Sequence, residues 1–194
     1  MPAPPSIIKI KMRALPTFAV LGLFLMPLSR ADVRNCVCDS TIAETMTGRE
    51  CSLCRDVEAM PPEPTTVFLK DANPNKPNRL LAVPRFHTKG PQQLQDLNPE
   101  QRLAYWSAAI AKGRELWGDH WGVALNSLER RTQCHLHVHI GKLLDDAETE
   151  HFSVVDGPAD LPLPQDGGGM WIHPVNGKLH VHTEEPNGEL RLQR

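Results

Sequence analysis

Hydrophobic residues recur along this chain with the two-residue period of strands more often than with the period of a helix. Residues 65–70 form a β-branched and aromatic run, 79–83 form an apolar run, and the turn-rich segment 71–78 lies between them. Together they predict a β-hairpin with a long connection. Residues 122–127 and 134–142 predict two further strands of the same sheet.

One long helix is predicted by apolar residues at helical spacing, and its ends are marked. Asn98 can cap the first turn, Pro99 fits the first helical position, and Gln101 completes a capping-box pattern. Gly118 is the expected stop. We expect this helix to cover one face of the sheet through its apolar side chains, Leu103, Trp106, Ile110 and Trp117.

The C-terminal region has its own turn signals. Segments 170–175 and 178–183 flank Asn176-Gly177, a strong short hairpin signal, and a further turn leads to 189–193. These segments predict a small hairpin or three-stranded meander. The fold class that we predict is α+β: an antiparallel sheet with a packed helix, plus this C-terminal hairpin.

The first 31 residues have the pattern of a secretory signal peptide. Three basic residues precede the apolar segment 14–28, and Ser29 and Ala31 place small residues where a signal peptidase cuts. The apolar segment is shorter than the ~20 residues that span a bilayer. We therefore expect cleavage after Ala31 and a secreted or periplasmic protein, with an uncleaved membrane anchor as the alternative.

Removal of this segment changes the charge of the protein. Residues 1–31 hold four of the 21 Lys and Arg residues and none of the 23 Asp and Glu residues, so the remaining chain has a formal net charge of −6. An acidic domain without a basic patch is a poor nucleic-acid binder. We divide the rest into a cysteine-rich segment (32–64), a catalytic core (65–144) and a C-terminal extension (145–194).

Four cysteines are grouped near the N-terminus, as the CxC pair Cys36 and Cys38 and the CxxC pair Cys51 and Cys54. In an exported protein such pairs favour disulfides, and we expect at least one. The same pattern also suits tetrahedral zinc, so both interpretations stay open. Cys134 is left over, and we expect it to face the core as a free thiol.

The string His135-Leu-His-Val-His-Ile140 carries the clearest chemistry. Side chains alternate along a strand, so His135, His137 and His139 should share one face. Three imidazoles on one face are costly as packing, because each needs hydrogen-bond partners. The string is therefore interpreted as a metal chelate or as a nucleophilic histidine held by its neighbours, and the string alone does not separate the two.

Four segments together resemble the histidine-triad superfamily: VFLKDANP (67–74), LLAVPRFH (80–87), VALNS (123–127) and HLHVHI (135–140). Within that superfamily, the sequences around Asn126 and RTQ (131–133) are most similar to bacterial CDP-diacylglycerol pyrophosphatase. The resemblance implies a hydrolase that cleaves a nucleotide phosphoanhydride, with CDP-diacylglycerol giving CMP and phosphatidate as the leading reaction.

The resemblance also implies roles for the histidines. His137 would attack the α-phosphorus and form a phosphohistidine intermediate. His139 and the backbone near His135 would fix the tautomer and orientation of His137, because only an unprotonated nitrogen can attack. His135 and His87 would line the phosphate site.

Polar residues outside the string would bind the substrate, and no metal would be required. By the same resemblance, Asp71 would accept hydrogen bonds from ribose hydroxyls, and Asn126, Gln133 and Thr132 would donate to phosphate oxygens. The expected partner is a nucleotide or nucleotide-lipid substrate, with membrane-surface contact and a homodimer as further options.

Zinc enters through a second feature of the resemblance. Some superfamily members hold a structural zinc with a CxxC pair and two histidines, which implies Cys51, Cys54, His87 and His135 as candidate ligands. Disulfides would compete for the two sulfurs. His180 and His182 share a strand face, as an accessory metal site or as a solvated strand, whereas His120, His151 and His173 carry no signal.

Two other functions stay open beside the pyrophosphatase. One is a soluble nucleotide or dinucleotide hydrolase, or a nucleotidyl transferase. The other is a non-enzymatic periplasmic metal-binding protein that uses the histidine pairs.

Overall fold

The computed structural model describes Met1 and residues 32–87, 89–183 and 185–194. The predicted signal peptide lies, apart from Met1, outside these residues. The described strands are β1 (Thr66–Lys70), β2 (Leu80–Pro84), β3 (Trp121–Leu125), β4 (Val138–Lys142), β5 (Ser153–Val155), β6 (Met170–Val175) and β7 (Lys178–His182). The α-helices are α1 (Ser52–Glu58) and α2 (Pro99–Trp117). Short 3-10 helices cover Ala43–Thr47, Arg49–Cys51, Leu94–Asp96, Pro158–Asp160, Gln165–Gly167 and Gly188–Arg191, the last of which is η6.

All seven strands form one antiparallel sheet in the order β1-β2-β4-β3-β6-β7-β5. The predicted α+β class is therefore confirmed. The β6–β7 hairpin turns at Asn176 and Gly177, which have φ angles of 50° and 78°, as a tight two-residue turn requires. Since β6 pairs with β3, the C-terminal hairpin continues the main sheet instead of forming a separate unit.

Helix α2 begins and ends where the sequence predicts. The side chain of Asn98 accepts a hydrogen bond from the backbone N–H of Gln101 in a capping box, and Gly118 follows the last turn with φ 58°. The helix covers one sheet face with Tyr105, Trp106, Ala109 and Ile110, whereas Leu103 is exposed, contrary to the prediction. This face holds the main apolar core.

The histidine strand is shorter than predicted, because β4 starts at Val138 and not at residue 134. The buried side chain of Gln92 accepts a hydrogen bond from the backbone N–H of Leu136, and the Gln92 N–H donates to the Cys134 carbonyl. These bonds take the backbone groups that a neighbouring strand would otherwise pair. His135 and His137 therefore lie in an irregular segment before the strand.

Two further predictions, one on the C-terminal segment and one on Cys134, are wrong. The expected strand at 189–193 is the 3-10 helix η6, whose Gly188 packs so closely on Trp171 that an added Cβ would lie 2.9 Å from the Trp171 Cβ. Cys134 is not free: disulfides join Cys36 to Cys134 and Cys38 to Cys51, with Cα–Cα distances of 6.2 and 5.7 Å. The prediction of at least one disulfide is confirmed, and Cys54 is the free cysteine.

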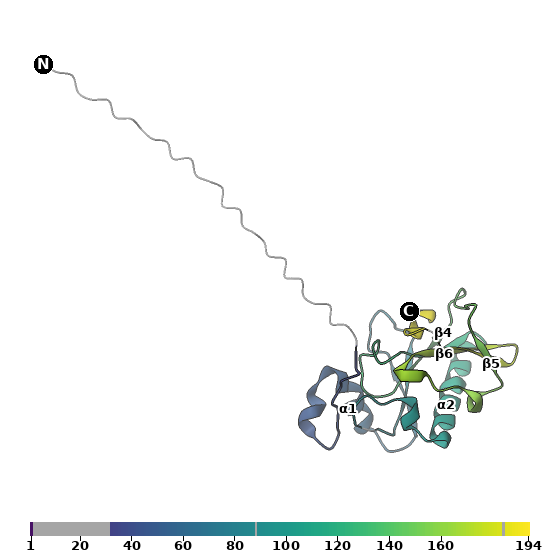
Figure 1. Cartoon of the computed structure of the whole chain (residues 1–194), viewed down its shortest axis with the longest axis horizontal. Helices are drawn as coiled ribbons and strands as arrows, with labels where there is room; N and C mark the ends of the chain where they lie inside the picture. Colours follow the sequence, from purple (N-terminus) through teal and green to yellow (C-terminus); the bar gives the residue numbers. More distant parts are fainter. Residues whose placement is uncertain (2–31, 88, 184) are drawn as a thin grey trace.

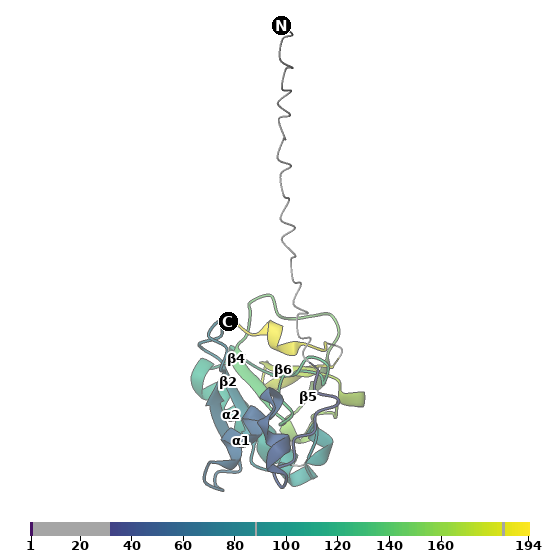
Figure 2. The same ribbon diagram turned by 90° about the vertical axis from the view of Figure 1, so that its left-hand side faces the viewer.

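The sheet face opposite α2 carries the candidate chemistry. Cross-strand pairing sets one row of side chains across it, in the order Leu69, Leu81, His139, Ala124, Trp171 and His182. Helix α1 packs on the β1–β2 end of this face, and η6 lies over its middle. Both views place the C-terminus near β4 (Figures 1 and 2), where Gln193 donates a backbone hydrogen bond to Lys142.

Candidate functional site

A cavity of about 970 Å³ opens on the face of the sheet that α2 leaves free. Six predicted site residues line it: Asp71, Asn126, Thr132, Gln133, His137 and His139. Its volume is at the upper end of the range of ~300–1,000 Å³ that is usual for small-molecule sites. The site that the sequence predicts is therefore largely assembled in one place.

His137 is held in one tautomer. Its Nδ1 lies 2.9 Å from the backbone carbonyl oxygen of His135, and a carbonyl only accepts, so Nδ1 carries the proton. The ring is buried, and burial, followed by the neighbouring charge of His139, lowers the pKa of His137 well below 6.5. At neutral pH the Nε2 atom is thus an unprotonated nitrogen with its lone pair free of this bond.

His139 contacts His137 edge to face, with ring centroids 5.2 Å apart and planes at 73°. Its Nδ1 lies 3.6 Å from the Asp71 Oδ2 and 3.5 Å from the Glu189 Oε2. Two carboxylates therefore face one side of this imidazole.

Asp71 has a second role in the chain. Its Oδ1 accepts a hydrogen bond of 2.9 Å from the backbone N–H of Asn73, so it also forms the turn that ends β1. Burial alone would raise the pKa of Asp71, but His139, the Asn73 N–H and Lys76 outweigh that effect and hold the pKa at about 2. The carboxylate stays ionised beside His139 throughout the physiological range.

Glu189 belongs to this site although sequence reasoning missed it. Its carboxylate pairs with Lys76 and, at 2.8 Å, with the buried guanidinium of Arg79, and its backbone N–H donates to the Asn126 Oδ1 at 3.2 Å. Burial opposes ionisation of Glu189, yet His139, Lys76 and Arg79 together lower its pKa. No local pattern points to this residue, because 50 positions separate it from His139.

The three predicted phosphate donors differ in whether their hydrogen-bonding groups are already used within the protein. The carbonyl oxygen of Asn126 is occupied by the Glu189 N–H, which leaves its amide NH₂ as a donor. The amide oxygen of Gln133 accepts from the Ser52 hydroxyl and from the Leu53 N–H at 3.0 Å each, and its Nε2 donates to the Arg49 carbonyl at 3.2 Å. Gln133 therefore fixes the start of α1 at the cavity wall. Thr132 is exposed.

The side chains that line the cavity have a net positive formal charge, whereas the chain as a whole has a net negative one. Five basic residues line it against three acidic ones. The basic residues are Arg49, Lys70, Lys76, Arg130 and Arg131, and the acidic ones are Asp56, Asp71 and Glu189. Such a cavity attracts an anion such as a phosphate group.

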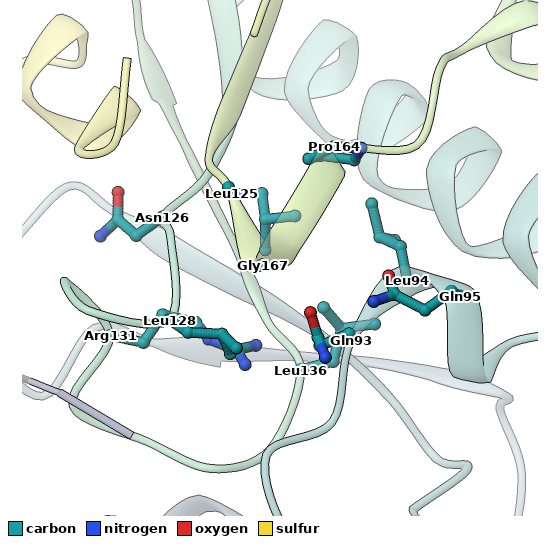
Figure 3. Close-up of a pocket in the computed structure, with 11 residues that line it drawn as sticks. Gln93, Leu94, Gln95, Leu125, Asn126, Leu128, Arg131, Leu136, Pro164 and Gly167 are labelled. Atoms are coloured by element: carbon teal, nitrogen blue, oxygen red, sulfur yellow. The ribbon is translucent and has the colours of Figure 1, made fainter. Parts of the chain in front are cut away.

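Arg131 is buried and bonds Gln92, the residue that holds the backbone on both sides of His135. Its Nη2 donates to the carbonyl of Gln92 at 2.8 Å, and burial lowers its pKa to about 10, so it stays charged at neutral pH. It also lines a second cavity of about 10 Å³, in which the Asn126 side chain points away from Leu94 and Leu136 (Figure 3). Since that space holds about one water molecule, it is a packing gap and not a ligand site.

His87 and His135 do not reach the large cavity, contrary to their expected place at the phosphate site. Their rings stack with centroids 4.8 Å apart, and the His87 Nε2 lies 3.3 Å from the Cys54 Sγ. The His135 Nε2 bonds the Pro84 carbonyl at 2.8 Å, and burial lowers the pKa of His135 to about 3. His135 therefore contributes to the cavity through its carbonyl, which orients His137.

The expected four-ligand zinc set does not come together as a whole. The ligand atoms of Cys54, His87 and His135 lie within 4.8 Å of one another, but the Cys51 sulfur is bonded to Cys38. With this disulfide in place, three of the four residues can act as ligands.

Among the residues that the structure describes, no helix is long and apolar enough to cross a membrane.

Comparisons with known proteins give no family assignment. A scan against protein-family models finds no match for the chain, and a search of curated proteins finds none either.

Proposed function

We propose that the protein is a phosphoanhydride hydrolase of the histidine-triad type, with His137 as the covalent nucleophile. One observation carries the proposal: the Nδ1 of His137 is committed to the His135 carbonyl, while the ring lines a cavity with more basic than acidic residues. A neutral imidazole with a fixed tautomer is the form that can attack phosphorus.

The reaction would proceed in two displacements. The Nε2 lone pair forms a bond to the α-phosphorus, and the bond from this phosphorus to the bridging oxygen breaks. The leaving phosphate takes a proton, and His139, whose ring contacts that of His137 and lies beside Asp71 and Glu189, is the candidate donor. Water then attacks the phosphorus and gives a proton back to His139, the N–P bond breaks, its electron pair returns to the His137 Nε2, and a nucleoside monophosphate leaves.

The cavity wall favours a nucleotide diester with an apolar part. The guanidinium of Arg130 and the amide NH₂ of Asn126 are candidate donors for the phosphate charge. Leu53 on α1, Met60 just after α1 and Leu69 on β1 form an apolar wall that suits a base or the start of an acyl chain. CDP-diacylglycerol, giving CMP and phosphatidate, is the leading substrate, and simpler nucleoside diphosphate esters are expected to react as well.

A second candidate function is metal binding without catalysis. Ligand atoms of Asp71, His139 and Glu189 lie within 4.8 Å of one another, so a cation bound there would occupy the place of the proton on His139. In that case hydrolysis would be absent or would depend on the metal.

The test is hydrolysis of CDP-diacylglycerol, read as released CMP, with and without EDTA. The His137→Ala variant is expected to lose at least ~10³-fold in kcat/KM, about 4 kcal/mol of transition-state stabilisation. Turnover by the unchanged protein is expected to survive EDTA. Protein quenched with an alkaline denaturant, which preserves the acid-labile N–P bond, is expected to carry label on His137 from substrate labelled in its CMP part. The matched control is His120→Ala, which removes an exposed histidine that does not line the cavity.

Circular dichroism checks that the His137→Ala variant folds. Near-normal turnover in a folded variant would refute covalent catalysis by this residue. Strict metal dependence without a labelled intermediate would favour the second candidate.

A further inference from the structure

A second group of histidines lies on the same sheet face, three strands away from His139. The row across the face runs from His139 on β4 through Ala124 and Trp171 to His182 on β7. At ~4.8 Å per strand, the two groups are about 14 Å apart. The second group, here called the hairpin cluster, consists of Glu148, His173, His180 and His182.

We propose that the hairpin cluster binds a transition-metal ion such as Zn²⁺ through Glu148, His173 and His182. The proposal is independent of the hydrolase function.

The spacing of the ligand atoms fits one ion. The Nε2 atoms of His173 and His182 are 3.4 Å apart, and each lies 3.1 Å from an oxygen of Glu148. Ligands at about 2.1 Å from a tetrahedral zinc lie roughly 3.4 Å from one another. The three side chains therefore hold nearly the separations that a bound zinc imposes.

The hydrogen bonds of His182 point its lone pair at the proposed ion. Its Nδ1 lies 2.8 Å from the Thr149 hydroxyl oxygen and 3.0 Å from the carbonyl oxygen of His151; the carbonyl only accepts and the hydroxyl can accept, so a proton on Nδ1 satisfies both contacts. The Nε2 lone pair then faces the Glu148 carboxylate and the His173 ring, an arrangement that a cation between them would stabilise. A ring N–H donated to a backbone carbonyl is also the usual outer contact of a metal-binding histidine.

Packing holds the rings in place before any ion binds. His182 stacks on Trp171 with centroids 3.7 Å apart, and His180 stacks on Phe152 at 4.1 Å. The Nδ1 of His180 lies 3.1 Å from the Glu148 Oε2, so His180 orients the carboxylate.

The site would join two segments that are distant in the sequence. Glu148 lies in the loop before β5 and is 44% exposed, whereas His173 and His182 come from the β6–β7 hairpin and are buried. The neighbouring Ala147 packs against Trp171, which fixes the loop. An ion here would tie this loop to the hairpin and leave a fourth position, open to solvent, for water.

The experiment uses Zn²⁺ alone as the probe, on the purified protein after dialysis against a chelator. Zinc stoichiometry and the thermal midpoint are measured for the unchanged protein and for Glu148→Ala, His182→Ala and His151→Ala. His151→Ala is the matched control, because it removes an exposed imidazole of the same loop and keeps the carbonyl that bonds His182.

The unchanged protein and His151→Ala are expected to gain roughly 5–10 °C in Tm at a free zinc concentration about 100-fold above Kd. Glu148→Ala should bind one zinc fewer and lose this gain, and because Glu148 is largely a surface residue this variant should fold. His182→Ala should behave alike if it folds. X-ray absorption should show nitrogen and oxygen ligands at about 2.0–2.1 Å.

Unchanged stoichiometry and Tm gain in Glu148→Ala would overturn the proposal. So would absence of zinc binding by the unchanged protein. A single bound zinc with sulfur at about 2.3 Å among its ligands would also overturn it, because that one ion would then sit at Cys54 and not in the hairpin cluster.

Discussion

The two disulfides close loops of very different length, so removing them should destabilise the protein unequally. Cys36 and Cys134 are 98 positions apart, whereas Cys38 and Cys51 are 13 apart. The loop-entropy relation gives about 4.7 kcal/mol for the long loop and about 2.9 kcal/mol for the short one. Replacing both cysteines of the long-range bridge by alanine should therefore cost about 1.8 kcal/mol more than the same change at the short-range bridge.

Urea unfolding of the two double variants measures this difference. Each variant loses two sulfur atoms, so packing losses largely cancel, and Cys54→Ala, which removes a buried sulfur without a crosslink, calibrates what remains. With an m-value of about 2 kcal/mol/M, the midpoints should differ by about 1 M. EDTA is present throughout, so that bound metal does not add to stability.

The reasoning would be refuted if Cys36→Ala/Cys134→Ala lost no more stability than Cys38→Ala/Cys51→Ala. The long-range variant should also lose more turnover under conditions where both are folded. Cys134 directly precedes His135, whose carbonyl orients the proposed nucleophile.

Two further predictions concern pH. Protonation of the His137 Nε2 would remove the nucleophile, and because burial lowers the pKa of His137, the acid limb of the kcat/KM profile for CMP release should lie below pH 6.5; a limb at or above 6.5 would contradict this. The pKa of Asp71 in the folded protein is about 2, below its ordinary 3.8, so the ionised carboxylate stabilises the folded state by about 2 kcal/mol. This stabilisation is complete above pH ~4 and is lost as the pH falls through 2. In Asp71→Asn, the free energy of unfolding should depend less steeply on pH over that interval. An unchanged dependence on pH would mean that Asp71 does not stabilise the folded state.

Local patterns were sufficient for the elements whose ends are set by neighbouring residues. The capping box at Asn98, the stop at Gly118 and the tight turn at Asn176-Gly177 each depend on hydrogen bonds or backbone angles within a few positions. For the same reason the strands of the first hairpin and of β3 and β6 lie within one or two residues of their predicted bounds. Because these elements position the cavity, six of the residues that line it could be predicted from the sequence.

Long-range contacts explain what the sequence did not predict. Alternation along a strand predicts one face for all three histidines, but Gln92 bonds the backbone on both sides of His135, so the strand begins four residues later than predicted. The same segment is tied to Cys36, and no spacing rule selects that partner for Cys134 over the nearer cysteines. His135 is thereby turned to His87, and only its carbonyl stays with His137.

In the C-terminal segment a strand was predicted where the structure has the 3-10 helix η6, and this difference matters for the site. Interpreted as a third meander strand, residues 189–193 would have paired at the sheet edge, away from the histidines. As η6 they cross the sheet face, because Gly188 lets the backbone approach Trp171 and Gly122 leaves room for Leu192. This crossing brings Glu189 to His139 on one side of Trp171, while His182 stacks on that same ring and belongs to the hairpin cluster. A single tryptophan and the helix above it therefore separate a cavity suited to phosphate from a group of side chains suited to a metal, so the two can be tested by independent substitutions.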